Sequence, residues 1–440
     1  MKFNFCSKPN QELVKKDDYG DEIDIYEHFD TSQSDDYIAG YLRDADYDKG
    51  IFKIVGEISG DKIKEILSEN SYLRGGEPNI YDVKQRIDLL DETWDIEWET
   101  YELRDEDDEI IVPTYTYAAS AFSVINSRVK CVFVDVNSDF TINIDEVEKA
   151  ITKNTKAIMP VDLGGLPADY IELNNLLNKE SVKSKFTPKT TFQRKIGRPI
   201  VLSDAAHSIG SLIDGVPTPL FSDFSVFSFH SVKNITTGEG GAITFKIFNE
   251  EQDGLILKEL RLLSLNGQNK TAFEKNSIGG WKYDITTNGL KVNMADINAA
   301  IGLAQIKKYK SILLPEREQI FLKYNLVLSQ YSWAILPTFT VNNRKSSCHL
   351  YQLRIEGFEE QQRDELISRL ASLNIGVNVH YIPLPMLSYF KSIGLDIKDF
   401  PSSYNLYKNE ISLPIYNDLA IESVEYVCEK LIEIVNEIIK

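Results

Sequence analysis

Residues 200–233 read IVLSDAAHSIGSLIDGVPTPLFSDFSVFSFHSVK and contain two short apolar runs. The first run ends at Asp204 and is followed by His207; the second contains Ser228 and is followed by Lys233. Runs of about four to eight residues rich in β-branched and aromatic types are typical of strands buried in a parallel sheet. Because ligands of such sheets bind beyond the carboxyl ends of the strands, these four polar residues are candidates for a functional site.

The same pattern extends on both sides of this stretch. Further short apolar runs are EIIVPTYTY (109–117), CVFVDV (131–136), AIMPVDL (157–163) and GAITFKI (241–247). Segments with helical spacing separate several of them, namely IDEVEKAITKN (144–154) and ADYIELNNLLN (168–178). Alternating strand and helix signals predict an α/β domain with a largely parallel, buried sheet.

The C-terminal part has a different pattern. We expect a helix over MADINAAIGLAQIKKYKSILL (294–314), ended or kinked by Pro315. Further on, YQLRIEGF (351–358) and VNVHYIPL (377–384) have the pattern of strands, and EQQRDELISRLASLN (360–374) and ESVEYVCEKLIEIVNEII (422–439) that of helices. The sequence therefore predicts an acidic extension over 1–50, a large α/β domain over 51–250 and a smaller α+β domain over 251–440.

The net charge of −19 is concentrated near the start of the chain. Residues 1–110 hold 31 acids and 13 bases, whereas the other 330 residues hold 36 acids and 35 bases. This balance argues against binding to nucleic acid or to an anionic membrane. Residues 1–50 are rich in Asp and Tyr, and we expect them either to stay solvated or to dock on the body through their tyrosines and isoleucines.

Cysteine usage and hydropathy exclude further classes. The four cysteines, Cys6, Cys131, Cys348 and Cys428, form no CxxC pair, which argues against a zinc site or a disulfide framework. The first 18 residues have no apolar core of the kind that a signal peptide needs, and no apolar run approaches membrane-spanning length. The predicted location is the cytoplasm.

A lysine, an aspartate and an aromatic ring at strand ends suggest pyridoxal phosphate. That cofactor needs a lysine for covalent attachment and an acid that keeps its ring nitrogen protonated. It also needs a flat group against the ring face and donors for the phosphate. Lys233, Asp204 and Tyr117 supply the first three, and Ser120 is a further polar residue at a strand end. The alternative is that Lys233 is a solvated charge at the end of a strand.

VLSDAAHSIGS (201–211) and FSFHSVKNITTGEGGAITF (227–245) together closely resemble the DegT/DnrJ/StrS family of pyridoxal-phosphate-dependent sugar aminotransferases. Agreement in order and spacing extends over roughly residues 105–440, including YDITTNGLKVNMADINAAIGLAQI (283–306), NIGVNVHYIPL (374–384) and ISLPIY (411–416). The resemblance implies a fold-type I aminotransferase: a large three-layer α/β domain with a mostly parallel sheet that binds the cofactor, plus a smaller C-terminal α+β domain.

The resemblance also implies roles for individual residues. Lys233 would hold pyridoxal 5'-phosphate covalently and carry a proton between substrate and cofactor. Asp204 would pair with the ring nitrogen, His207 would contact the ring's phenolic oxygen or its face, Tyr117 would stack on the other face, and Ser228 would bind the phosphate.

Three more residues complete the implied site. Lys291 matches the position from which the family reaches the phosphate of the neighbouring subunit, which makes the assembly a homodimer with shared active sites or a heterodimer with a related subunit. His380 and Asn234 match positions on the substrate side, although a structural role for His380 is an equal alternative. We interpret His230 and His349 as structural, because a lone histidine beside a strand is usually a hydrogen-bonded core group.

The implied reaction moves an amino group, from glutamate, to a keto group on a nucleotide-linked sugar used for surface polysaccharide or glycoside biosynthesis. A dehydratase of the same family would carry a histidine in place of Lys233. The sequence departs from the family in residues 87–109, where a Ser-Gly-Thr phosphate-binding turn is absent. The alternative reading is therefore a degenerate, non-catalytic member that acts as a scaffold or regulatory partner of an active aminotransferase.

Residues 179–198 are strongly basic, with seven bases and one acid. We interpret them as an inserted, exposed flexible loop. The functional alternatives are that they replace the lost phosphate contacts or bind the diphosphate of the nucleotide-linked sugar.

Overall fold

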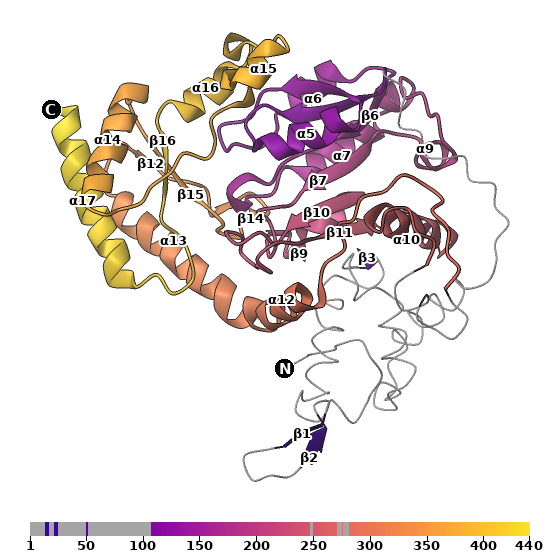
Figure 1. Ribbon diagram of the computed structural model, residues 1–440. Helices are drawn as coiled ribbons and strands as arrows, with labels where there is room; N and C mark the ends of the chain where they lie inside the picture. The colour runs from indigo at the N-terminus through magenta and orange to yellow at the C-terminus, as the bar shows by residue number, and fades with distance from the viewer. Residues whose placement is uncertain are drawn as a thin grey trace. The chain divides into compact units, whose positions relative to one another are not determined.

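The computed structural model describes residues 14–16, 22–24, 50–51, 107–246, 250–270, 275 and 281–440 (Figure 1). The chain forms two compact units. The main unit comprises Trp98–Ser228, Val232–Ile235 and Lys308–Lys440, and the second unit comprises the remaining residues. Every predicted site residue except Lys291 belongs to the main unit.

A parallel sheet forms the centre of the main unit, and its strands lie in the order β10-β7-β6-β4-β5. In chain order these are β4 (Glu109–Pro113), β5 (Lys130–Val134), β6 (Thr155–Ile158), β7 (Ile200–Asp204) and β10 (Phe224–Ser228). The chain passes from β4 to β5 on one side and then to β6 on the other. The strand order therefore reverses between β4 and β6, the kind of point at which α/β sheets bind ligands.

Helices cover both faces of this sheet, so that β4 is buried throughout (Figure 1). On one face, Ile110 and Val112 pack against Val124 of α5 (Ala118–Asn126). On the other face, Ile111 lies in the core formed with α6 (Ile144–Ala150) and α7 (Tyr170–Asn178). Successive strand residues point to opposite faces, so both faces are apolar. The predicted three-layer α/β domain is confirmed.

Side-chain caps fix where α6 and α7 begin. The Asn143 side chain accepts a hydrogen bond from the Glu146 N–H at 3.1 Å, and the Asp169 side chain accepts one from the Glu172 N–H at 2.9 Å. Such caps satisfy backbone donors that a helix leaves unpaired at its first turn.

The C-terminal part of the main unit has an antiparallel sheet in the order β12-β15-β16. Its strands are β12 (Ala334–Ile335), β15 (Tyr351–Ile355) and β16 (Glu410–Leu413), and its helices are α13 (Leu314–Leu328), α14 (Glu360–Ser372) and α17 (Ile421–Ile439). One apolar core joins the sheet to the three helices. The predicted strand at 351–358 and both predicted helices, 360–374 and 422–439, are confirmed.

One prediction for this part is wrong, and one of the two alternatives for Pro315 is excluded, while the other, a kink, stays a prediction. Residues 377–384 form no strand and make only an isolated bridge between Asn378 and Ser412. Pro383 has no N–H, and the His380 N–H donates to a side chain instead of a strand. In addition, Pro315 does not end a helix. It lies in the first turn of α13, where a missing N–H is tolerated, after α12 (Asp296–Lys308) and the π-helical turn η5 (Tyr309–Leu313).

The remaining elements are short or belong to the second unit. In the main unit, an antiparallel sheet has the order β13-β14-β8-β9. The shorter elements there are β8 (Leu212–Ile213), β9 (Val216–Pro217), β13 (Thr340–Val341), β14 (Arg344–Lys345), η3 (Leu163–Gly165), η4 (Thr218–Phe221), η6 (Leu384–Met386), α15 (Ser388–Ser392), η7 (Ile397–Asp399) and α16 (Pro401–Tyr407). The second unit has β1 (Val14–Lys16), β2 (Glu22–Asp24), β3 (Gly50–Ile51), β11 (Gly241–Lys246), α10 (Glu250–Ser264) and most of α12. None of the helices in the described residues is long and apolar enough to span a membrane.

Several predictions concern residues outside the described ranges. These are the fate of the acidic residues 1–50, apart from the strands named above, and the altered stretch 87–106. The predicted domain boundaries stay predictions.

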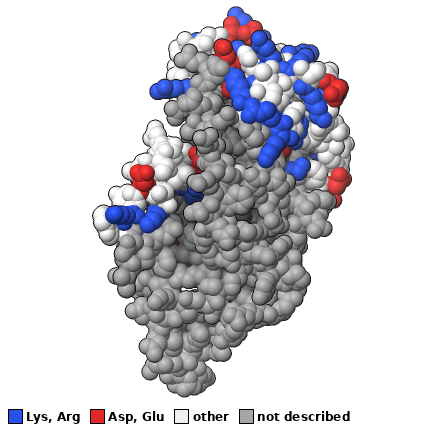
Figure 2. All heavy atoms as spheres, turned by 90° about the vertical axis from the view of Figure 1, so that its right-hand side faces the viewer, with Lys and Arg blue, Asp and Glu red and all other residues white. Residues whose placement is uncertain are grey.

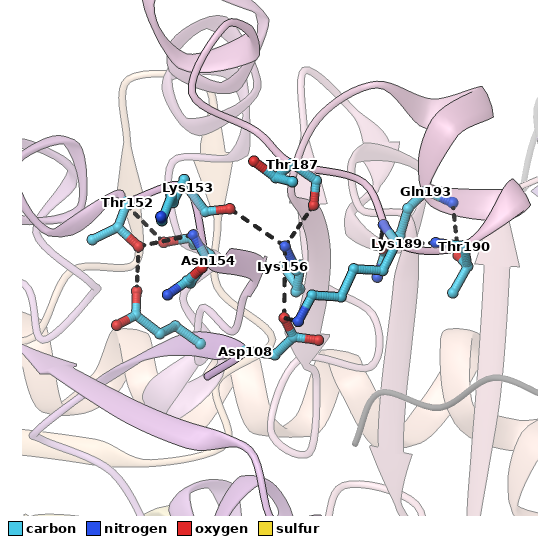
Figure 3. Close-up of polar contacts among 11 residues, drawn as sticks. Asp108, Thr152, Lys153, Asn154, Lys156, Thr187, Lys189, Thr190 and Gln193 are labelled. Atoms are coloured by element: carbon cyan, nitrogen blue, oxygen red, sulfur yellow. Dashed lines mark hydrogen bonds and ion pairs between the residues drawn. The ribbon is translucent and has the colours of Figure 1, made fainter. Parts of the chain in front are cut away.

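The basic residues 179–198 are not an irregular loop. They contain α8 (Glu180–Lys183) and α9 (Thr191–Ile196), the latter begun by a capping box of Thr190 and Gln193. A buried ion cluster joins them to the sheet (Figure 3). Lys189 Nζ lies 2.7 Å from Asp108 Oδ1, and Lys156 Nζ lies 3.6 Å from the same oxygen.

Lys156 makes a second contact with the segment 179–198. Its buried ammonium group donates to the backbone carbonyl of Thr187 at 2.6 Å. Lys185, Arg194 and Lys195 are exposed on this segment. Figure 2 shows that Lys and Arg side chains gather over the upper part of the side of the molecule that it views. The interpretation of this segment as an irregular loop is wrong, because it contains two helices and is joined to Asp108 and Lys156 by an ion pair and a hydrogen bond. Its flexibility stays a prediction.

A second buried ion pair sits where this segment enters β7. Arg198 donates to both carboxylate oxygens of Asp223, at 2.8 and 2.9 Å, and Asp223 also accepts from the Val201 N–H at 2.7 Å. Arg198 is 8% exposed and Asp223 is 2% exposed. Removal of one partner of such a pair strongly lowers the free energy of unfolding, because the remaining charge stays buried without an opposite charge.

We expect Asp223→Ala to lower the free energy of unfolding by about 3–5 kcal/mol, since it leaves the Arg198 guanidinium buried and unpaired. Urea denaturation followed by circular dichroism measures the change. The control is Lys179→Ala, which removes an exposed ion pair with Glu148 and should change the same quantity by about 1 kcal/mol or less. Equal losses in the two variants would contradict this assignment.

Candidate active site

The predicted site residues of the main unit lie near the carboxyl ends of β4, β7 and β10. Tyr117 follows β4, Asp204 ends β7 and Ser228 ends β10. Lys233 and Asn234 follow β10 by a few residues, and His207 follows β7. Because the strands are parallel, these ends meet at one edge of the sheet.

Lys233 is the partly buried cation of this edge. Burial lowers the pKa of its amine, and the negative charge of Asp204 opposes the shift. Within the described part of the chain, no hydrogen bond or ion pair occupies this amine. A lysine with a lowered pKa and no partner is suited to act as a nucleophile, since only the neutral amine attacks.

Asp204 is held in place by donors on both of its oxygens. Ser120 Oγ donates to Oδ2 at 2.7 Å, and the Ala206 N–H donates to Oδ1 at 3.2 Å. Ser120 in turn shares a hydrogen bond of 2.9 Å with Thr116. Thr116 lies between β4 and α5, and Ser120 lies in the first turn of α5, so the chain on either side of Tyr117 also fixes the carboxylate.

Beneath Asp204 lies a second, fully buried acid, Asp162. It accepts hydrogen bonds from Ser208 Oγ at 2.6 Å, from Tyr170 Oη at 2.9 Å and from the Ala168 N–H at 2.9 Å. Burial raises its pKa to about 6, and these donors limit the rise. Sequence reasoning did not assign this residue, although Asp162 lies near the end of the apolar run AIMPVDL (157–163).

His207 lies in the buried wall of the site. Its Nδ1 accepts a hydrogen bond from the Gly164 N–H at 3.2 Å, so in the neutral ring Nε2 carries the proton. Burial, followed by the charge of Lys233, lowers its pKa well below the usual value, which keeps the ring neutral. Gly164 has φ of +66°, and a Cβ there would lie 2.4 Å from Gln352 Oε1, so only glycine allows this approach.

His349 and Asn234 stand behind His207. The ring centroids of His207 and His349 are 4.1 Å apart, and His349 Nδ1 donates to Asn234 Oδ1 at 2.7 Å. The Asn234 amide nitrogen donates to the Ser347 carbonyl at 2.9 Å and to Tyr309 Oη at 3.3 Å. Asn234 thus supports the histidine pair from behind. Its predicted contact with substrate stays a prediction.

Two tyrosines and His380 line the open side. Tyr117 is 61% exposed, and its ring centroid lies 5.5 Å from that of Tyr381, whose hydroxyl is 3.5 Å from His207 Nε2. Burial lowers the pKa of His380 to about 4, and the charge of Lys233 acts in the same direction. His380 Nδ1 is buried and has no hydrogen-bond partner among the described residues.

Tyr381 is a site residue that sequence reasoning missed. Its position after His380 in VNVHY could have identified it, since a residue next to a candidate at a chain turn shares its surroundings. Ser228 ends β10 and is partly buried, as a phosphate ligand could be. Lys291 is exposed in the second unit, where its Nζ donates to Asn293, so its predicted role toward a neighbouring subunit stays a prediction.

These residues fit pyridoxal 5'-phosphate. An amine without a hydrogen-bond or ion-pair partner among the described residues lies within the electrostatic influence of a carboxylate whose two oxygens accept hydrogen bonds, and flat rings lie on the same edge of the sheet. The unpartnered, buried His380 Nδ1 adds a polar atom directed at no protein group. Among the described residues, no cluster of His, Cys, Asp or Glu could hold a metal ion.

Comparison with known proteins agrees with this chemistry. Residues 100–186 and 191–432 match the DegT/DnrJ/EryC1/StrS aminotransferase family. The chain belongs to this family. Within the matched range only residues 187–190, in the middle of the basic segment, are left out.

Three relatives of this family member illustrate the match. The spore coat polysaccharide biosynthesis protein SpsC of Bacillus subtilis is 32% identical over 74% of this chain and 79% of its own length. The UDP-4-amino-4-deoxy-L-arabinose--oxoglutarate aminotransferase of Shewanella sediminis is 28% identical over 74% of this chain and 80% of its own length. The Streptococcus pneumoniae protein Spr1654, in its PLP form, is 37% identical with a TM-score of 0.71, covering 76% of this chain and 82% of that one.

The lowered pKa of Lys233 yields a prediction for its reactivity. Competitive acetylation of the apo protein across a pH series, read by mass spectrometry, should give a midpoint for Lys233 below 10.5. Asp204→Asn should move the midpoint further down, because the carboxylate stabilises the charged amine. The peptide that carries Lys195 serves as the internal reference. A midpoint that rises or stays constant in the variant would show that Asp204 does not act on Lys233.

Proposed function

We propose that this protein transfers an amino group from glutamate to a keto group of a nucleotide-linked sugar, with pyridoxal 5'-phosphate as cofactor. The observation that carries the proposal is the partly buried Lys233 amine, whose pKa is influenced by the charge of Asp204, in a chain of the aminotransferase family. The named activity of the Shewanella sediminis relative, which couples a UDP-linked amino sugar to oxoglutarate, supports both the sugar class and glutamate as donor.

When bound, pyridoxal phosphate supplies an electron-accepting ring and a carbonyl group that exchanges amines. Asp204 would keep the ring nitrogen protonated, a task for which Ser120 and the Ala206 N–H hold its carboxylate in place. Tyr117 and His207 would enclose the ring plane, and Ser228 would contribute to phosphate binding. Lys233 would hold the cofactor between turnovers.

Lys233 is also the group that moves the proton. Its Nζ would take a proton from the substrate carbon and pass it to a carbon atom of the cofactor, which requires a neutral amine at the start. Burial lowers its pKa in that direction. His207 and His380 have lowered pKa values as well, so they stay neutral at physiological pH and leave this proton to the lysine.

We infer that the working assembly is a homodimer with shared sites, or a heterodimer with a related subunit. Support comes from Lys291, which lies in the second unit at the position that the family uses toward a neighbouring subunit. The predicted use in surface polysaccharide biosynthesis is supported by the likeness to SpsC, whose name gives that role. The predicted cytoplasmic location stays a prediction.

The first half-reaction tests the proposal. Purified protein loaded with pyridoxal phosphate and given glutamate should change its visible absorbance and release about one 2-oxoglutarate per subunit. Lys233→Ala is the control and should release none. Addition of a UDP-linked keto sugar should then restore the starting spectrum and yield the amino sugar.

The outcomes separate the two candidate functions. A protein that binds the cofactor but reacts with no amino acid in a panel that includes alanine and aspartate would contradict the catalytic proposal. A protein that fails to bind the cofactor would support the degenerate alternative. Reaction with a donor other than glutamate would correct only the donor.

A further inference from the structure

One face of the C-terminal sheet is polar although it is buried. In the antiparallel pair β15–β16, Gln352 lies opposite Ser412 and Arg354 lies opposite Glu410. Their neighbours along the strands, such as Leu353 and Ile411, belong to the apolar core on the other face. Gln352, Glu410 and Ser412 are 5%, 0% and 4% exposed. A buried polar group destabilises the folded protein unless it is hydrogen-bonded. The hydrogen-bond partners of these side chains therefore indicate their structural role.

Their partners lie in the segment that was wrongly predicted as a strand. The His380 N–H donates to Glu410 Oε2 at 3.1 Å, and Gln352 Nε2 donates to the His380 carbonyl at 2.8 Å. Both backbone groups of one residue are therefore held by side chains. Ser412 Oγ donates to the second oxygen of Glu410 at 2.6 Å, which fixes the carboxyl group, and burial raises the pKa of Glu410 to about 8.

The side chains of this segment reach the candidate active site. Tyr381 places its hydroxyl 3.5 Å from His207 Nε2 and its ring 5.5 Å from that of Tyr117. Burial and then the charge of Lys233 lower the pKa of His380. Residues 377–384 lack a ladder of strand hydrogen bonds and make backbone hydrogen bonds at Asn378, with Ser412, and at Leu384, with Thr114. Between these two points, the two side-chain contacts restrain the backbone of His380.

We propose that Glu410 and Gln352 are positioning residues, which fix the backbone of His380 and thereby hold Tyr381 against His207 and Tyr117 at the cofactor site. Neither residue touches the reacting groups in this arrangement. The inference rests on the cofactor of the proposed function, but it does not depend on the sugar or on the amino donor.

The decisive comparison is Glu410→Leu with Glu410→Gln. Leucine removes the acceptor for the His380 N–H. Glutamine keeps it, and its amide can donate to Ser412 Oγ. The matched control is Asn409→Ala, which removes a neighbouring buried side chain whose amide donates to the Ile355 carbonyl at 2.9 Å and does not reach His380.

Each variant is assayed through the dissociation constant for pyridoxal phosphate, the visible circular dichroism of the bound cofactor and the rate of the half-reaction. Glu410→Leu should weaken binding or reduce the dichroic band, and slow the half-reaction by about tenfold or more, as expected when a site wall shifts by a fraction of an ångström. Glu410→Gln should restore these values to within about threefold. Asn409→Ala should lower the thermal unfolding temperature and leave the cofactor spectrum unchanged.

The proposal is overturned if Glu410→Leu and Asn409→Ala alter the cofactor spectrum alike, or if Glu410→Gln fails to restore it. Should Glu410→Leu not fold, Gln352→Leu takes its place, since it removes only the donor to the His380 carbonyl. An unchanged spectrum and affinity in a folded Gln352→Leu would then reject the role. Absence of the half-reaction in the unsubstituted protein, with the cofactor bound, would count against the proposed function instead.

Discussion

Burial of the central parallel sheet on both faces is the constraint on which the site depends. Ile110, Ile111 and Val112 of β4 are all inaccessible or nearly so, because helices cover each face. Polar side chains can then occur in this layer only near strand ends, where hydrogen-bond partners exist. The strand order reverses beside β4, and ligands of α/β sheets bind at the carboxyl edge near such a reversal. Asp204 ends β7 at this edge, and Asp162 follows the end of β6.

The same burial sets the electrostatics of the site. It lowers the pKa values of Lys233, His207 and His380, whereas it raises that of Asp162. Nearby charge then adjusts these effects, since Asp204 opposes the shift of Lys233. The result is a site with a carboxylate held by hydrogen bonds, neutral imidazole rings and an amine whose pKa is lowered, a combination suited to amine exchange at a carbonyl.

Much of this architecture was predictable from local sequence. Short apolar runs predicted the strands, and polar residues at their ends predicted Lys233, Asp204 and His207, because both signals depend on a few adjacent residues. The segment 377–384 was misread, because an apolar alternation does not reveal whether a backbone N–H meets another strand or a distant carboxylate. Glu410 and Gln352 lie 30 and 28 residues from His380, beyond any local pattern.

The prediction of a loop over the basic residues 179–198 was wrong for a similar reason. Its composition resembles that of a solvated loop, but Asp108, far earlier in the chain, neutralises Lys189 and contacts Lys156. Tyr381 follows the candidate residue His380 but was overlooked, because its contacts with His207 and Tyr117 join residues that lie far apart in the sequence. Contacts over long separations decided each of these cases, and they depend on the folded sheet rather than on propensity.

The most direct test of the account is to map the attachment point of the cofactor. The protein is loaded with pyridoxal phosphate, reduced with borohydride, digested and analysed by mass spectrometry. The account predicts the added cofactor mass on the peptide that contains Lys233, and on no other lysine at comparable yield. Attachment chiefly at another lysine, or no attachment to folded protein, would contradict it.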